Sequence, residues 1–185
     1  MSAPGARRPR VFTLGHSDHT LEEFIEILGR SSVRLVADVR SNPASARFPW
    51  FERNALAAEL ERRGLFYRWF RDLGGRRPAT PGEDRHTALA DPSLRRYAAA
   101  MNTPRFDERC AELLGLAAST VAVVLCAERD FRQCHRHLLA DKLVLAGSRV
   151  VHILGADDAV DHELHPDLEV VDGELIYSGR QLELI

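Results

Sequence analysis

Residues 121–136, VAVVLCAERDFRQCHR, join an apolar run to a dense group of side chains that can serve as acids, bases, nucleophiles or ligands. The run 121–125 is short and rich in valine, which predicts a buried strand. Thiol, carboxylate, guanidinium and imidazole groups follow directly, before helical periodicity resumes at Leu138. Because open α/β sheets bind ligands beyond the carboxyl ends of their strands, this segment is the first candidate for a functional site.

The elements that would position this segment follow an alternating pattern of strands and helices. Further short apolar runs at 11–14, 33–37, 65–70 and 149–154 predict strands. Helical patterns lie between them, with Thr20 and Glu23 as a capping box, Ser93 as a cap and Thr103 before a helix. We therefore expect one three-layer α/β domain over residues 10–185, with a mostly parallel sheet of about five strands flanked by helices. Asp172 begins a favoured two-residue turn, which predicts a C-terminal hairpin.

Composition narrows the class of protein. The chain has 185 residues, a formal net charge of -2 and three cysteines. Three cysteines are too few for a disulfide framework, which indicates a reducing, cytoplasmic setting. No apolar stretch approaches the ~20 residues of a membrane span, so we expect no membrane partner. Residues 1–9 have a basic start with no apolar region behind it, and we expect a disordered tail rather than a secretory signal.

Unusual residues follow four of the predicted strands. They are residues 15–17 (GHS), 38–40 (DVR), 74–75 (GG) and 126–128 (CAE). In a parallel sheet these strand ends share one edge, so groups about a hundred residues apart in sequence would converge there. The sequence thus predicts a single site at this edge, under the loops 41–51 and 76–92.

The order of these motifs resembles the bacterial family called domain of unknown function 488. The matching segments are GHS at 15–17, DVR at 38–40, LGG at 73–75, LCAE at 125–128 and CHR at 134–136. The resemblance implies a compact α/β domain but no settled activity. It directs attention to Ser17, Asp38, Arg40, Glu128, Cys134, His135 and Arg136. Family members often have a proline before CHR, whereas this chain has Phe131-Arg132-Gln133.

The first hypothesis for the chemistry is an enzyme, a hydrolase or transferase, that acts on a glycosidic bond or on a nucleotide-like or phosphorylated substrate. Glu128 and Asp38 would be the acid–base groups, and Arg40 and Arg136 would bind the anion. A purely structural alternative is that Asp38 and Arg40 pair with neighbours and only fix the loops. The residues expected to contact or orient the ligand beside them are Gly15, His16, Ser17, Ser41, Gly74 and Gly75.

Metal and thiol chemistry are the second and third hypotheses. Zinc could be held by residues from the set Cys126, Cys134, His135, His137, His162 and His165. The seven-residue gap between the two cysteines is not a metal-knuckle spacing, so we expect no metal or other cofactor and keep zinc as the lesser alternative. Cys134, near a helix start and Arg136, is the better candidate for an activated thiol. Cys126 and Cys110 are more easily explained as small buried hydrophobes.

A nucleic-acid-binding module is the remaining alternative. Arginines interleave with aromatic residues in a pattern that can bind phosphate and stack on bases. They are Arg7, Arg8, Arg10, Arg47, Arg53 and the arginines of 68–85, with Phe48, Trp50, Phe51, Tyr67 and Trp69. The sequence does not distinguish a small-molecule substrate from an oligonucleotide, and it gives no oligomeric state.

Overall fold

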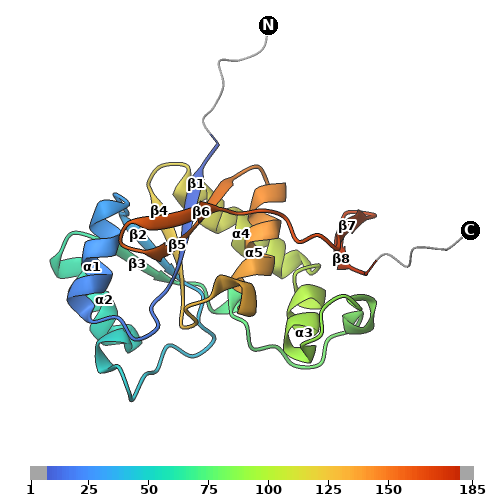
Figure 1. Cartoon of the computed structure of the whole chain (residues 1–185), viewed down its shortest axis with the longest axis horizontal. Helices are drawn as coiled ribbons and strands as arrows, with labels where there is room; N and C mark the ends of the chain where they lie inside the picture. Colours follow the sequence, from blue (N-terminus) through green and yellow to red (C-terminus); the bar gives the residue numbers. More distant parts are fainter. Residues whose placement is uncertain (1–7, 180–185) are drawn as a thin grey trace, which may run out of the picture.

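A six-stranded sheet forms the centre of the molecule, in the computed structural model that describes residues 8–179 (Figure 1). The strands run in the order β3-β2-β4-β1-β5-β6. Their bounds are β1 (Arg10–Gly15), β2 (Leu35–Asp38), β3 (Phe66–Trp69), β4 (Ala122–Cys126), β5 (Arg149–Gly155) and β6 (Asp158–Asp161). The first five strands pair in parallel and β6 is antiparallel to β5. The predicted α/β class and mostly parallel sheet are confirmed, with one strand more than expected.

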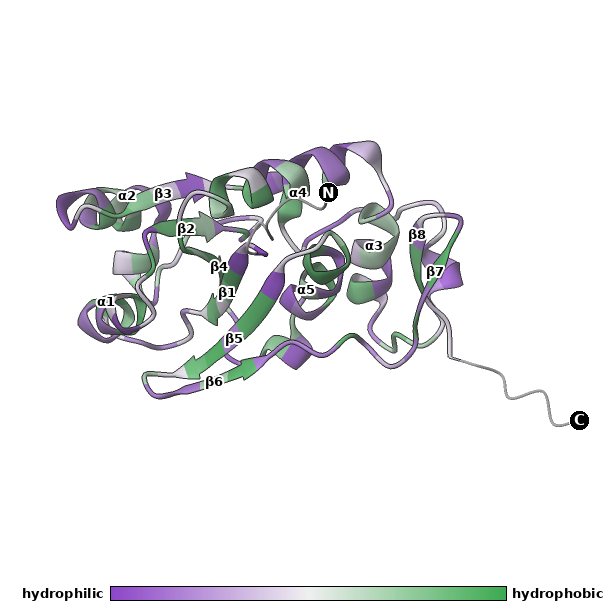
Figure 2. Ribbon diagram, turned by 90° about the horizontal axis from the view of Figure 1, so that it is seen from above, coloured by the Kyte–Doolittle hydropathy of each residue, from purple (hydrophilic) through white to green (hydrophobic). Residues whose placement is uncertain are grey.

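Helices cover both faces of the sheet, which makes the three predicted layers. On one face lie α1 (Leu21–Arg30) and α2 (Arg53–Arg62), and on the other α4 (Pro104–Ala117) and α5 (Arg136–Leu145) (Figures 1 and 2). Beyond α5 lie α3 (Pro92–Ala100) and the separate hairpin of β7 (Leu168–Val171) and β8 (Glu174–Tyr177) (Figure 2). Short 3₁₀ turns complete the chain at η1 (Pro49–Phe51), η2 (Arg71–Leu73), η3 (Glu83–Arg85) and η4 (Phe131–Gln133).

The central strand β4 shows why the sheet needs helices on both sides. All five of its residues are buried. Val123 and Leu125 pack toward α1 and α2, whereas Ala122, Val124 and Cys126 pack toward α4 and α5. Successive side chains of a strand point to opposite faces, so a continuous apolar run supplies both cores at once. The structure therefore confirms the buried strand predicted from the apolar run at 121–125.

Local signals explain most of the element ends. The Thr20 hydroxyl accepts from the N–H of Glu23, whose carboxylate accepts from the N–H of Thr20, as the capping box predicts. At α3, however, the cap is Asp91, which accepts from the N–H of Ser93, so the prediction of Ser93 as the cap was wrong. Pro92 at the first helical position fits this earlier start. The hairpin turn at Asp172 is confirmed, with φ of 52° there.

The chain ends lie only partly within the described residues. Of the predicted tail 1–9, residues 1–7, including Arg7, lie outside them. Pro9 is held against the sheet, because its carbonyl accepts from the N–H of Arg149 at 2.9 Å. Between residues 8 and 179, none of the helices has the length and hydropathy to cross a membrane.

Candidate functional site

A cleft of about 1040 Å³ opens beyond the carboxyl ends of β1, β2 and β4. Its walls come from the loops that the sequence placed over the site, together with the segment after β4. The predicted site residues that line it are His16, Ser17, Arg40, Ser41, Gly75, Glu128, Cys134 and His135. A larger groove of about 1190 Å³ lies at the opposite edge of the sheet and contains none of these residues. The cleft is therefore the candidate site.

Asp38 does not line the cleft but holds Arg40, which does. Its side chain is completely buried at the end of β2. The guanidinium of Arg40 donates to both carboxylate oxygens, and the Tyr67 hydroxyl donates to Oδ2 at 2.7 Å. With its oxygens occupied and no exposed surface, Asp38 is placed to position Arg40 rather than to exchange protons with a substrate. Of the two carboxylates that the sequence paired as acid and base, only Glu128 lines the cleft.

His16 packs beside this ion pair at the end of β1. Its ring stacks on Phe51 with centroids 4.2 Å apart, and its Nε2 lies 3.4 Å from Nη1 of Arg40. Nδ1 lies 3.0 Å from the carbonyl of Ser17, an acceptor, so the ring proton belongs on Nδ1 and Nε2 is free to accept from Arg40. Burial, aided by the Arg40 charge, lowers the pKa of His16 to about 4. His16 is therefore neutral at pH 7 and does not add positive charge to the cleft.

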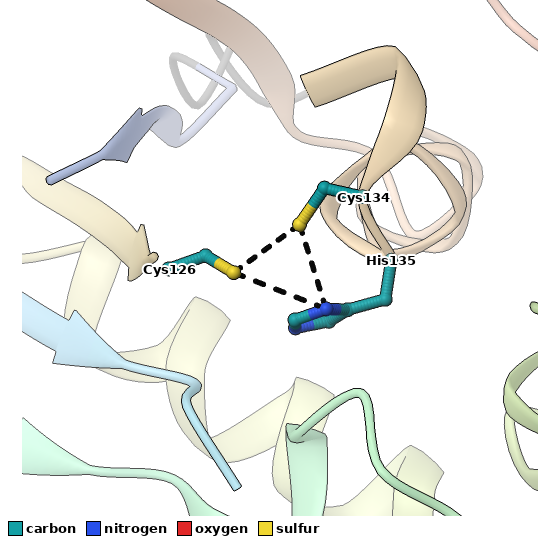
Figure 3. A group of neighbouring side chains, drawn as sticks. All are labelled: Cys126, Cys134 and His135. Carbon is teal, nitrogen blue, oxygen red and sulfur yellow. Dashed lines mark hydrogen bonds between the residues drawn. The ribbon is translucent and has the colours of Figure 1, made fainter. Parts of the chain in front are cut away.

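Two thiols and an imidazole meet at the floor of the cleft (Figure 3). Sγ of Cys126 lies 3.2 Å from Sγ of Cys134, and Nδ1 of His135 lies 3.5 Å from the second sulfur and 4.0 Å from the first. Cys126 ends β4, whereas the other two residues directly precede α5. The 3₁₀ turn η4 folds the intervening chain back, so residues separated by seven positions become neighbours.

The sulfur pair favours a thiolate on Cys126. Hydrogen bonding from Cys134 lowers the pKa of Cys126, and the charge of Arg136 and the backbone N–H groups of Glu128 and Ala127 act in the same direction. The same contact, with burial, raises the pKa of Cys134. The sequence favoured Cys134 as the activated thiol, and which of the two thiols is activated stays a prediction. Cys110 lies near the middle of α4 and is buried. Burial raises its pKa to about 12, as expected for a core residue.

Three glycines that were expected to let a ligand approach the backbone instead let residues of neighbouring loops approach it. A Cβ on Gly15 would lie 1.7 Å from the carbonyl oxygen of Glu128. A Cβ on Gly74 would lie 2.5 Å from the hydroxyl oxygen of Ser41, and one on Gly75 would lie 2.5 Å from Nδ1 of His135. Of the three, only Gly75 lines the cleft. Their lack of a side chain thus sets how closely the strand-end loops pack.

Arg136, predicted to bind an anion, lies beneath the loop rather than in the cleft. It is almost fully buried, and its Nη2 donates to the carbonyls of Glu128 and Arg129. It therefore braces the loop after β4. The two serines are also engaged with protein, because the hydroxyl of Ser17 donates to Asp18 and that of Ser41 accepts from the N–H of Arg76.

The charge of the cleft comes mainly from arginines outside the predicted anion-binding set. Five arginines line it against two carboxylates: Arg40, Arg47, Arg76, Arg77 and Arg96, with Asp91 and Glu128. The arginine-rich character of 68–85 was visible in the sequence, but it was attributed to a nucleic-acid face. The predicted position of the loop 76–92 over the site was the signal that could have assigned Arg76 and Arg77 to it.

The aromatic residues proposed to stack on bases are mostly engaged with protein. Phe51 is buried, and the indole N–H groups of Trp50 and Trp69 donate to the carbonyls of His19 and Arg40. The hydroxyl of Tyr67 donates a hydrogen bond to the carboxylate of Asp38. Only Phe48 of this set lines the cleft.

The remaining histidines of the zinc hypothesis form a separate network. His162 bridges Nε2 of His152 and the carboxylate of Asp141, at 2.8 and 2.9 Å. His137 and His165 pack edge-on against each other, with centroids 5.5 Å apart. This network lies between α5, β5 and the segment before β7, so these histidines do not join the thiols.

Comparison with known proteins identifies one family. The family model described as "Domain of unknown function DUF488" matches residues 20–143, about two thirds of the 185-residue chain. No curated protein and no solved structure matches the chain.

Proposed function

The chain belongs to the DUF488 family, whose description assigns no activity, and we propose from its site that it is an enzyme acting on an anionic small molecule. The reaction class is hydrolysis or group transfer, and the substrate is phosphorylated or nucleotide-like. The reducing, cytoplasmic setting expected from the sequence is part of this proposal, and the three free cysteines are compatible with it.

The excess of arginine in the cleft is the observation that carries this proposal. Four of the five contact a partner: Arg40 pairs with Asp38 and Arg96 with Glu83, whereas Arg77 lies over the ring of Tyr97 and Arg47 over that of Phe48. Arg47 and Arg76 are exposed, and neither has an ion-pair partner within residues 8–179. A guanidinium presents a planar fork of donors that matches phosphate oxygens, so these two side chains are suited to grip the substrate.

The groups that would act on the bound substrate lie on two sides of the cleft. Glu128 is exposed on its wall and is free to serve as general acid or base. Cys126, Cys134 and His135 form its floor. Asp38 contributes through Arg40, as a positioning residue rather than a catalytic one.

The binding step is tested by thermal unfolding with inorganic phosphate, sugar phosphates and nucleotides. We expect at least one of these compounds to raise the Tm, since a ligand at 100 times its Kd adds about 2.7 kcal/mol of stability. The double variant Arg47→Ala/Arg76→Ala should lose this shift. Arg34→Ala is the matched control, because Arg34 is exposed and lies at the opposite edge, just before β2.

Two results would contradict the proposal: no shift with any compound, or an undiminished shift in the double variant. Salt-dependent binding of oligonucleotides without any small-molecule shift would favour a binding module instead. Once a shifting compound is found, loss of its turnover in Glu128→Gln with binding retained would identify Glu128 as the acid–base group.

A further inference from the structure

Three potential metal ligands lie together at the floor of the cleft. They are the sulfurs of Cys126 and Cys134 and Nδ1 of His135, all within 4.8 Å of one another. Figure 3 shows the three side chains, one from the end of β4 and two from the residues just before α5, pointing toward a common centre. No other group of three histidine, cysteine or acidic ligands is this close among residues 8–179.

The spacing of these atoms suits tetrahedral zinc. Zinc–sulfur bonds of about 2.3 Å and zinc–nitrogen bonds of about 2.0 Å at tetrahedral angles imply about 3.8 Å between two sulfurs and about 3.5 Å between sulfur and nitrogen. The observed separations are 3.2 Å between the sulfurs and 3.5 and 4.0 Å from Nδ1. A shift of a few tenths of an ångström would bring all three onto one ion. The gap along the chain, which argued against zinc, ceases to matter once η4 brings the segments together.

The surroundings support ligation by these atoms. The backbone of Gly75 lies against the imidazole ring, since a Cβ there would fall 2.5 Å from Nδ1. Nδ1 of His135 faces the sulfurs, whereas its Nε2 is buried with no hydrogen-bond partner within the described residues.

We propose that Cys126, Cys134 and His135 bind one zinc ion, with the fourth coordination position open to the cleft. All three ligands line the cleft, so the open position faces the same space as Arg47 and Arg76. Two thiolates balance the charge of Zn²⁺, and the site as a whole is neutral. Three protein ligands with an open position are typical of catalytic zinc, which holds a water there. The binding of zinc stands on its own, and only its use in a reaction rests on the proposed function.

The first test is the metal content of the full chain purified under reducing conditions without chelator. We expect about one zinc per chain in the wild type and in Cys110→Ser, a matched control whose thiol lies outside the cluster. Cys126→Ser, Cys134→Ser and His135→Gln should each lose it. Replacement of zinc by Co²⁺ in the wild type should give the absorption bands of a tetrahedral thiolate site, a readout that needs no variant to fold.

A second test uses a residue that supplies no ligand atom. Gly75→Ala should push the imidazole away and weaken Co²⁺ binding by roughly tenfold or more, as outer-shell changes do. Gly29→Ala, where an added Cβ meets nothing within 4 Å, should bind Co²⁺ as the wild type does.

Reduced wild-type protein that contains no zinc and gives no Co²⁺ bands would overturn the metal site. Full zinc occupancy in all three ligand variants would overturn it as well. These measurements contain no substrate, so they separate the two proposals. Zinc with no phosphate-dependent Tm shift contradicts only the proposed function, and a phosphate shift without zinc contradicts only the metal site.

Discussion

The carboxylate of Asp38 and the guanidinium of Arg40 form a buried ion pair at the end of β2, with Nη2 2.5 Å from Oδ2. Both residues belong to the DVR segment, so the two charged side chains of one short motif pair with each other. The pair sets the position of Arg40 in the lining of the cleft. Four predictions test how this and other buried contacts maintain the site.

Asp38→Asn should destabilise the fold strongly, because it leaves the Arg40 charge buried without its partner. Breaking a buried pair from one side costs about 3–5 kcal/mol in the free energy of unfolding. Tyr67→Phe, which removes one donor and leaves the pair intact, should cost less, about 1.5 kcal/mol. Urea unfolding measures both. Asp157→Asn, in an exposed pair with Arg30, is the control and should change little; a similar loss there would refute the special role of burial.

Two glycine substitutions should have opposite signs. Gly15→Ala forces a Cβ against the backbone of Glu128 and should cost about 1–3 kcal/mol as overpacking. Gly115→Ala, at an exposed helical site of α4 where the Cβ meets nothing within 4 Å, should stabilise by about 0.4–1 kcal/mol. Midpoints of urea unfolding at constant slope are the measurement. An unchanged midpoint for Gly15→Ala would show that the loop after β4 can move away.

Stability should fall as the pH drops below about 6.5, the ordinary pKa of histidine. Burial lowers the pKa of His152 to about 2 and that of His16 to about 4. Between these values and 6.5, each of the two histidines binds a proton in the unfolded chain but not in the folded chain. The free energy of unfolding therefore falls by up to about 1.4 kcal/mol per pH unit for each histidine. Both contributions are fully present only above pH 6.5.

Urea unfolding at pH 7.5, 6.5 and 5.5 checks this dependence. The window lies above the range in which the lowered pKa values of Asp18, Glu23, Glu59 and Asp161 act. His152→Gln should flatten the slope by about one proton, whatever its stability at pH 7.5. A variant slope equal to that of the wild type would show that His152 does not titrate on unfolding.

Asp141→Asn should loosen the C-terminal hairpin while leaving the central sheet intact. The completely buried carboxylate of Asp141, on α5, accepts from the Tyr177 hydroxyl and the N–H of His165, and its Oδ1 lies 2.9 Å from Nε2 of His162. It thereby joins α5 to the segment before β7 and to β8. Amide hydrogen exchange should accelerate in β7 and β8 and not in β1 or β4. Uniform acceleration in all strands would mean that the hairpin and the sheet open together.

The sequence was most informative where hydrophobic patterning acts alone. Apolar runs located all five parallel strands, and the turn at Asp172 located the hairpin. β6 was missed because its four residues, DAVD, are largely exposed and contain too few apolar side chains to form a pattern. The common edge of the strand ends followed from parallel topology, and it correctly brought together His16, Arg40 and Glu128.

The contacts inside the site were harder to foresee, because they depend on side-chain directions within loops. Cys126 looked like a core residue since it ends an apolar strand, and in fact it is both buried and part of the cleft floor. Nothing in linear spacing shows that η4 returns Cys134 to its side. The glycines were recognised as sites of close approach, but only the folded loops reveal that the approaching atoms belong to the protein.

The position of β4 also has a consequence for the order in which the chain can assemble. β4 lies between β2 and β1, and the one other strand that pairs with β1 within residues 8–179 is β5, which comes later still. During synthesis β1 therefore has no partner strand until Ala122 and the residues after it emerge, although β2 and β3 can already pair. The slow step should be this long-range pairing. A chain truncated before β4 lacks the strand that unites the two halves of the sheet, and with it the floor of the cleft.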